Sequence, residues 1–175
     1  AKALVLRESL LGKYHPQTSR TYFSMGCALH GKGDYHDALI ALRRTMRIAT
    51  VTPDKANKLQ GAKDYICWVL RKAGKDDKDV AAYQEQLTQA IDHEMKGDKA
   101  AERRDHEKAL EEYTKAVEVE SASAGEGHVD IADLYAKIAD AIVALQDDND
   151  DDSSASKYYT KALQIYQEAF GEDHP

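Results

Sequence analysis

The sequence contains few residues that interrupt helices or crosslink chains. Its 175 residues include three prolines, ten glycines and two cysteines, Cys27 and Cys67. Two cysteines are too few for a disulfide framework, which suits a reducing compartment and predicts a cytoplasmic location. The scarcity of proline and glycine, beside abundant alanine, leucine, lysine and glutamate, predicts an all-α protein.

Long apolar runs are absent as well. The longest covers residues 65–70 and is followed by Arg71 and Lys72, whereas a membrane-spanning helix needs about 20 consecutive apolar residues. No secretory signal is found. The chain begins inside a helical pattern and without methionine, so we interpret it as a piece of a larger protein. We expect no membrane partner.

The motifs of common catalytic and cofactor sites are missing too. No Gly-x-Ser-x-Gly elbow, phosphate-binding loop or Rossmann fingerprint occurs. Cys27, His30 and His36 lack a fourth residue that would complete a zinc site. The acidic run 147–152 lacks the glycine and glutamate that an EF-hand loop requires. We therefore expect no enzymatic activity, no cofactor and no bound metal.

What the sequence does contain is a helix-turn-helix pattern over residues 15–48. Two segments, 18–30 and 37–48, place apolar or small residues on one helical face and flank a glycine-containing turn at 31–35. These are Tyr22, Met25, Gly26 and Leu29, then Ala38, Leu39, Leu42 and Met46. Glycine inside a helix costs about 1 kcal/mol relative to alanine. Gly26 therefore predicts a close helix approach opposite Ala38.

The end of this pattern recurs along the chain. Ala3 to Pro16 and Ala162 to Pro175 align with their glycine and His-Pro in register. A weaker third copy begins at Ala116, with Gly125 and His128 at the matching places. Because His15, His128 and His174 follow the repeat period, we predict that they organise the loops.

These residues resemble the tetratricopeptide repeats of kinesin light chains. The likeness rests on Leu-Gly-Lys-Tyr-His-Pro at 11–16, Phe-Gly-Glu-Asp-His-Pro at 170–175, and Lys-Gly-Asp-Tyr at 32–35 followed by Asp-Ala-Leu at 37–39. It extends over most of the chain. The resemblance implies an α-solenoid of stacked helix-turn-helix repeats forming a right-handed superhelix, which serves as a scaffold for protein partners.

We expect one domain over residues 1–175. It would comprise a half repeat (1–15), a repeat (16–50), irregular repeats (51–104), a second helix (105–127) and a final repeat (128–175). The segment 121–127 reads as a small-residue loop, and 147–152 as an insertion in the last turn. Three registers remain open for 88–104: Gly97 inside a first helix, a turn at 96–98, or one long helix from Lys78 to about Arg104.

Charge is distributed unevenly between the two parts of the chain. Residues 1–75 hold 14 Lys and Arg against 5 Asp and Glu, and residues 76–175 hold 10 against 26. Such a split can steer an acidic ligand to one end and a basic ligand to the other. Nucleic acid is an alternative ligand for Arg43, Arg44 and Arg47, with Arg71, Lys72 and Lys75 nearby. The net charge of −7 disfavours it.

The candidate binding site lies on the concave face, where the first helices of stacked repeats would line a groove. Counting from the small residues of each helix predicts the partner-binding set Arg20, Phe23, Cys27, His30, Asp64, Tyr65, Trp68, Arg71, Lys72, Asp133, Lys137 and Asp140. Aromatic rings beside arginine and lysine suit an extended peptide. The alternative is that Phe23 and Trp68 only fill the seam between helices.

We therefore expect a protein or peptide partner in the groove, and the resemblance implies cargo or adaptor peptides with an aromatic residue in an acidic stretch. Two alternatives belong to other classes. Uncapped ends would allow end-to-end self-association of the chain. A third hypothesis is an accessory segment of a larger enzyme or motor, whose chemistry lies outside the chain.

Overall fold

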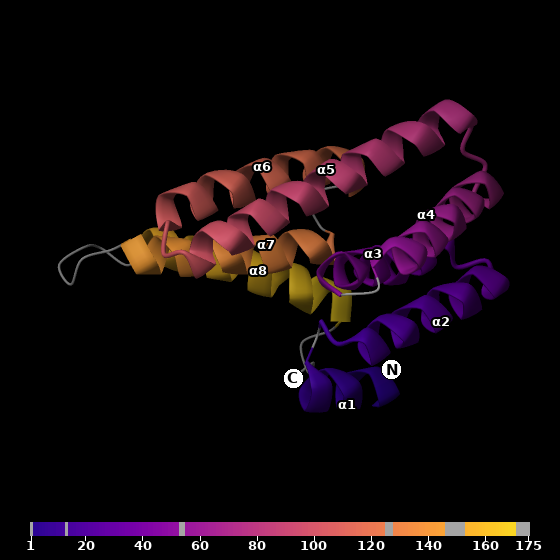
Figure 1. Cartoon of the computed structure of the whole chain (residues 1–175), viewed down its shortest axis with the longest axis horizontal. Coiled ribbons are helices and arrows are strands. Elements are labelled where there is room, and N and C mark those ends of the chain that lie inside the picture. The colour runs from indigo at the N-terminus through magenta and orange to yellow at the C-terminus, as the bar shows by residue number, and fades with distance from the viewer. Residues whose placement is uncertain (1, 13, 53–54, 125–127, 146–152, 171–175) are drawn as a thin grey trace. The chain divides into compact units, whose positions relative to one another are not determined.

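The protein is built entirely from helices in the part of the chain that the structure describes. The computed structural model describes residues 2–12, 14–52, 55–124, 128–145 and 153–170, which form eight helices and no strand (Figure 1). The helices are α1 (Lys2–Leu11), α2 (Pro16–Lys32), α3 (Tyr35–Val51), α4 (Lys55–Lys72), α5 (Asp77–Glu102), α6 (His106–Ala124), α7 (Val129–Leu145) and α8 (Ser153–Phe170). The expected all-α class is confirmed, and the right-handed solenoid stays a prediction.

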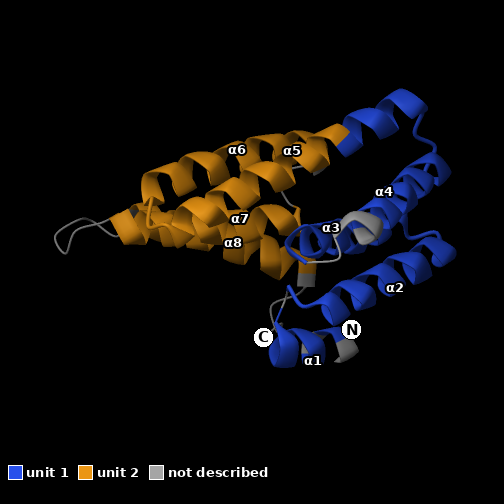
Figure 2. Ribbon diagram, in the orientation of Figure 1, with its two compact units in different colours: residues 1–84 blue, residues 85–175 orange. Residues whose placement is uncertain are grey.

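Two compact units divide the chain, and the boundary lies inside α5. Unit 1 covers residues 1–84 and unit 2 covers residues 85–175 (Figure 2). Unit 1 therefore contains α1 to α4 with the beginning of α5, and unit 2 contains the rest of α5 with α6 to α8. In the described residues, no helix combines the length and apolar character required to span a bilayer.

The α2–α3 hairpin has the turn chemistry that its sequence predicts. His15 precedes α2 in an extended conformation and accepts the backbone N–H of Gln17 through its side chain, while Pro16 occupies the first helical turn. Gly33 ends the helix with φ +88°, a left-handed conformation that glycine adopts without strain. Asp34 then donates its backbone N–H to the carbonyl of Leu29. These contacts fix the hairpin.

The seam of this hairpin confirms the role predicted for Gly26. A Cβ built on Gly26 would lie 2.9 Å from Cγ of Leu42 and 3.3 Å from the carbonyl oxygen of Ala38. Only a residue without a side chain allows α2 to approach α3 this closely. The core of unit 1 continues from this seam through Ala41 and Met46 of α3 to Ile66 and Val69 of α4, all buried.

The structure decides between the three registers of residues 88–104. α5 is a single helix from Asp77 to Glu102, so the long-helix alternative is confirmed. Gly97 lies inside a helix, as the first alternative also expected, and a turn at 96–98 is wrong. Gly97 is buried within it against α6, where an added Cβ would lie 2.5 Å from Cε1 of Tyr113. The chain turns at Arg104 instead, a residue with φ +61°. The same Lys-Gly-Asp sequence forms a turn at 32–34, where Gly33 has φ +88° and open space around it, whereas Gly97 is helical and faces a ring.

Unit 2 is held together by two adjoining apolar clusters. The first joins α5, α6 and α7, and the second joins α7 to α8. Members of the first are Ala100, Ala109, Tyr113, Ala116, Leu134 and Ile138. Members of the second are Ile131, Ala132, Ala162 and Ile165. Because α7 contributes Leu134 and Ile138 to the first cluster and Ile131 and Ala132 to the second, it packs between its neighbours.

One expected loop is partly wrong. Residues 121–124 belong to α6, which ends at Ala124, because alanine and serine prolong a helix when no proline or glycine stops it. The remainder of that loop, the acidic run 147–152 and His174 lie outside the described residues. Gly12, with φ +86°, ends α1 as expected.

The close contact at Gly97 predicts opposite effects for two glycine-to-alanine substitutions. Gly97→Ala should lower the free energy of unfolding by about 1–3 kcal/mol, since Tyr113 is buried and its ring must move. Gly61→Ala is the matched control, because Gly61 is also helical but meets nothing within 4 Å. It should raise the free energy of unfolding by about 0.5–1 kcal/mol. Urea unfolding of both variants checks this, and equal effects would contradict the packing described for α5 and α6.

Candidate functional site

Unit 1 brings five of the predicted site residues together in one group. Phe23, Cys27 and His30 come from α2, and Tyr65 and Trp68 come from α4. We call Phe23, His30, Tyr65 and Trp68 the aromatic cluster. Within each helix these residues are three, four or seven positions apart, so they lie on one helical face. The sequence pattern of two first helices therefore produces one continuous aromatic surface.

The rings of the aromatic cluster contact one another across the two helices. The ring centroids of His30 and Trp68 lie 3.9 Å apart. Phe23 meets Tyr65 edge-to-face at 5.6 Å, and Tyr65 lies 5.2 Å from Trp68. These separations are typical of favourable aromatic pairs, each worth about 0.5–1.5 kcal/mol beyond the area they bury. The cluster is therefore a preorganised surface rather than four independent side chains.

Burial within the cluster is graded. Trp68 is 42% exposed, while Phe23, His30 and Tyr65 are half-buried. The alternative that Phe23 and Trp68 only fill the seam is thus partly right for Phe23. It fails for Trp68, whose ring covers its neighbours and also faces solvent. Sequence reasoning missed Tyr35 at the start of α3, whose ring lies 5.5 Å from that of His30.

Tyr65 is the most strongly perturbed titratable group of the site. Burial raises the pKa of Tyr65 from 10.0 to about 12, and the hydrogen bond and the electrostatic interaction with Cys27 raise it further. All three causes favour the neutral phenol over the phenolate. At physiological pH Tyr65 is therefore an uncharged ring in the middle of the cluster.

Charged side chains surround the exposed part of the cluster. Arg20 on α2 and Arg71 and Lys72 at the end of α4 are exposed. Arg71 pairs with Asp77 at 3.0 Å, where both side chains are mostly in solvent, so this pair contributes little to stability. Asp64 accepts a hydrogen bond from Gln60 on the same helix at 2.8 Å. The cationic groups are consequently available to a ligand.

The predicted site residues of unit 2 have structural partners instead. Asp133 and Asp140 on α7 accept hydrogen bonds from the hydroxyls of Tyr166 and Tyr159 on α8. Their position in the sequence predicted a groove, but these side chains face the neighbouring helix. Asp133 and Asp140 therefore tie α8 to α7.

Lys137 is the centre of a polar network between α5 and α7. Its ammonium group lies 2.8 Å from Glu94 and 2.6 Å from Asp98, and 5.5 Å from the ring centroid of Tyr113. Tyr113 donates its hydroxyl hydrogen to Asp98 as well, at 2.8 Å. Sequence reasoning missed Glu94 and Asp98, although their spacing of four puts them on one helical face.

A second ion-pair group lies beside this network. His93 on α5 contacts Glu112 on α6 at 2.7 Å, and Lys115 reaches the same carboxylate at 3.2 Å. These hydrogen bonds, that of His93 foremost, hold the pKa of Glu112 below its usual value. The contact between His93 and Glu112 links α5 to α6.

Two of the three histidines that recur with the repeat period, His15 and His128, have the structural role predicted for them. Nδ1 of His15 accepts the N–H of Gln17 at 3.1 Å, and Nδ1 of His128 accepts the N–H of Asp130 at 3.2 Å. In both places the ring accepts a hydrogen bond from a backbone N–H group in the first turn of a helix. Such N–H groups have no hydrogen-bond partner within the helix itself.

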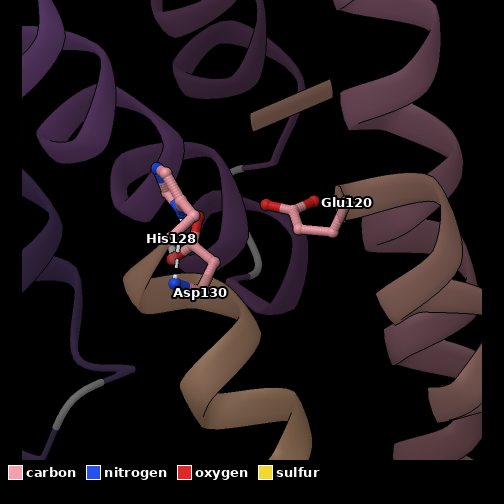
Figure 3. Close-up of side chains that lie close together, drawn as sticks. All are labelled: Glu120, His128 and Asp130. Atoms are coloured by element: carbon pink, nitrogen blue, oxygen red, sulfur yellow. Dashed lines mark hydrogen bonds and ion pairs between the residues drawn. The ribbon is translucent and has the colours of Figure 1, made fainter. Parts of the chain in front are cut away.

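One group of buried side chains has the composition of a metal site. Glu120, His128 and Asp130 are all buried and offer ligand atoms within 4.8 Å of one another. Figure 3 shows Glu120 extending from α6 toward the other two, which lie at the start of α7. Nδ1 of His128 lies 3.6 Å from Asp130 and already caps the helix. Binding a cation through that nitrogen would release the cap, so we assign the group to the helix junction.

The basic residues that suggested nucleic acid are placed differently from a phosphate-binding surface. Arg43 and Arg47 on α3 are buried, with 0% and 7% of their surface exposed. Arg43 donates to the hydroxyl of Tyr83 on α5 at 2.8 Å. Side chains enclosed in this way cannot reach a nucleic-acid backbone, which requires accessible cations.

The alkaline titration of tyrosine tests the environment described for Tyr65. In the wild-type protein Tyr65 should stay a neutral phenol until about pH 12, and Tyr65→Phe should remove one phenol from the last step in tyrosinate absorbance. The neutral phenol stabilises the fold fully below pH 10, and this contribution is lost as the pH rises toward 12. Cys27→Ala is the control: it should move the last step only part-way down, because burial is the larger cause. An identical last step in wild type and Tyr65→Phe would contradict the assignment.

Comparisons with known protein families divide the chain close to the boundary between unit 1 and unit 2. A tetratricopeptide repeat model matches residues 1–50, which confirms a repeat of this type over α1, α2 and most of α3. The kinesin light chain version of the repeat is not distinguished by this match. The chain has no match among curated proteins.

A second family model covers α5 to α8. It is described as an uncharacterized protein conserved in bacteria (DUF2225) and matches residues 78–174. The match includes most of unit 2 and the described part of the last helical hairpin. Because it spans more than half of the 175 residues, the chain belongs to the DUF2225 family of proteins conserved in bacteria.

Proposed function

We propose that the protein is an interaction module that binds an extended peptide of a protein partner across α2 and α4, with Trp68 as the anchor. The observation that carries this proposal is the packing of the Trp68 ring against that of His30, with centroids 3.9 Å apart, while 42% of the surface of Trp68 stays exposed. Interface hot spots are enriched in tryptophan, tyrosine and arginine. A tetratricopeptide repeat in residues 1–50 supports a protein as the partner.

The preorganised packing of the cluster supports this choice of site. A ring that is already fixed by its neighbours loses little conformational entropy when a ligand covers it. Trp68 is fixed by His30 and Tyr65, and Tyr65 is fixed by Phe23. Binding at this surface therefore costs little additional ordering of side chains.

The charge of unit 1 indicates the chemistry of the peptide. Residues 1–84 hold 15 Lys and Arg against 8 Asp and Glu, and Arg20, Arg71 and Lys72 are exposed beside the cluster. An acidic peptide would be steered to this surface. An aromatic residue within it would pack on Trp68, in line with the cargo or adaptor recognition that resemblance to kinesin light chains implies.

The proposal includes no catalytic step, no cofactor, no metal and no nucleic acid. The burial of Arg43 and Arg47 supports the proposal that nucleic acid is not a ligand. A cytoplasmic location is supported by the two cysteines, Cys27 and Cys67, which are both free thiols. A role as an accessory segment of a larger enzyme or motor is compatible with peptide binding.

Self-association is the second candidate, and the charge split favours it. Residues 85–175 hold 9 Lys and Arg against 23 Asp and Glu, so unit 2 is acidic where unit 1 is basic. Copies could attract one another through these unlike surfaces. Sedimentation at several salt concentrations tests this directly, because such association should weaken as salt rises.

Peptide binding is tested with short labelled peptides of two classes, acidic with an aromatic residue and basic with an aromatic residue. We expect saturable binding of the acidic class by fluorescence anisotropy. Trp68→Ala should weaken it at least tenfold through loss of the anchor, about 1.4 kcal/mol or more. Arg71→Glu should weaken it several-fold through charge repulsion.

Matched controls separate the site from general effects of substitution. Tyr159→Ala removes a ring of similar exposure in unit 2, 41% against 42% for Trp68, and Lys108→Glu reverses an exposed charge there. Both should bind the peptide as the wild type does, and circular dichroism should show unchanged helicity in all four variants. Equal losses in the controls, or no binding of either class, would remove the proposed function.

A further inference from the structure

α1 has an exposed apolar face that no helix of unit 1 covers. Leu6 is 59% exposed and Leu10 is 71% exposed, and their spacing of four places them on one side of the helix. The opposite side of α1 contacts α2, where Tyr22 donates a hydrogen bond to Glu8 at 2.7 Å. Two large leucines side by side on a surface mark an interaction site more often than single scattered ones do.

The internal repeat indicates what belongs on this face. With Ala3 aligned to Ala162, Leu6 corresponds to Ile165 on α8. Ile165 is 8% exposed and packs with Ile131 and Ala132 of α7. The weaker copy on α6 carries Val119 at the same position, and that side chain is half-buried. The position is thus apolar in three copies and exposed only in α1.

We propose that the face of α1 around Leu6 binds an amphipathic helix of the kind that α7 presents to α8. Such a helix offers an isoleucine and an alanine in succession, with a tyrosine four residues after the isoleucine, as in Ile131, Ala132 and Tyr135. The surface is separate from the aromatic cluster, so this inference does not rest on peptide binding there.

Charge complementarity supports the same occupant. Arg7 stands where α8 has Tyr166, and Tyr166 donates its hydroxyl hydrogen to Asp133 of α7. A helix docked on α1 in the equivalent register would bring its aspartate to Arg7, which now donates to Thr21. Residues 128–145 contain three aspartates and one lysine, and unit 1 is basic. An acidic helix of this kind is therefore attracted to the basic surface of unit 1.

A synthetic peptide with the sequence of residues 128–145 tests the proposal on the full chain. Labelled at its N-terminus, it should bind the wild-type chain saturably by fluorescence anisotropy. Leu6→Asp should weaken binding at least tenfold, because it places a charge against the apolar side of the helix. Leu163→Asp is the control, since Leu163 is 55% exposed on α8, and it should leave binding unchanged. Both positions are exposed, so circular dichroism should show both variants folded.

A charge exchange tests the register. The Arg7→Glu variant should bind the wild-type peptide more weakly than the wild-type chain does. A peptide that carries Asp133→Lys should bind the Arg7→Glu variant tightly again, but not the wild-type chain. The proposal would be overturned if this rescue fails, if the peptide does not bind, or if it binds the wild type and Leu6→Asp equally. Equal binding would mean that the peptide exchanges with the chain's own α7. A Leu6-dependent dimer that the peptide does not displace would also overturn it, because the occupant would then be a second copy.

Discussion

The close approach of paired helices is the constraint on which the rest of the structure depends. At Gly26 a Cβ would collide with Leu42 of the facing helix, and at Gly97 it would collide with the ring of Tyr113. Helices that touch at such points have a fixed rotation about their axes, since any other face would present side chains too large for the seam. This rotation decides which residues enter the core and which face a ligand.

The same constraint has different consequences in the two units. In unit 1 the residues beside the seam are Phe23, His30, Tyr65 and Trp68, which form a rigid aromatic surface edged by cations. In unit 2 the corresponding places are filled by Lys137 with Glu94 and Asp98, and by tyrosine–aspartate hydrogen bonds. Polar groups that satisfy one another in this way hold helices in position but offer a peptide little apolar area. Packed helical hairpins thus carry an aromatic surface in one unit and polar cross-links in the other.

Most of the helices and the contact at Gly26 were predictable, because helical periodicity and turn glycines are local signals. The register of residues 88–104 was not, since the same Lys-Gly-Asp sequence forms a turn at 32–34 and part of a helix at 96–98, where Gly97 packs against the ring of Tyr113. The aromatic cluster was predictable by counting from Gly26 and Cys67. The roles of Asp133, Lys137 and Asp140 were not, because their partners come from α5 and α8, far away in sequence.

Hydrogen exchange measured with and without a bound acidic peptide tests the central claim most directly, because it locates the ligand without altering any side chain. The structure predicts that the peptide slows exchange of amides in α2 and α4, chiefly around residues 20–32 and 63–72, and leaves α6 to α8 unchanged. Protection that appears in unit 2, or equally over the whole chain, would contradict the assignment of the binding surface to the aromatic cluster.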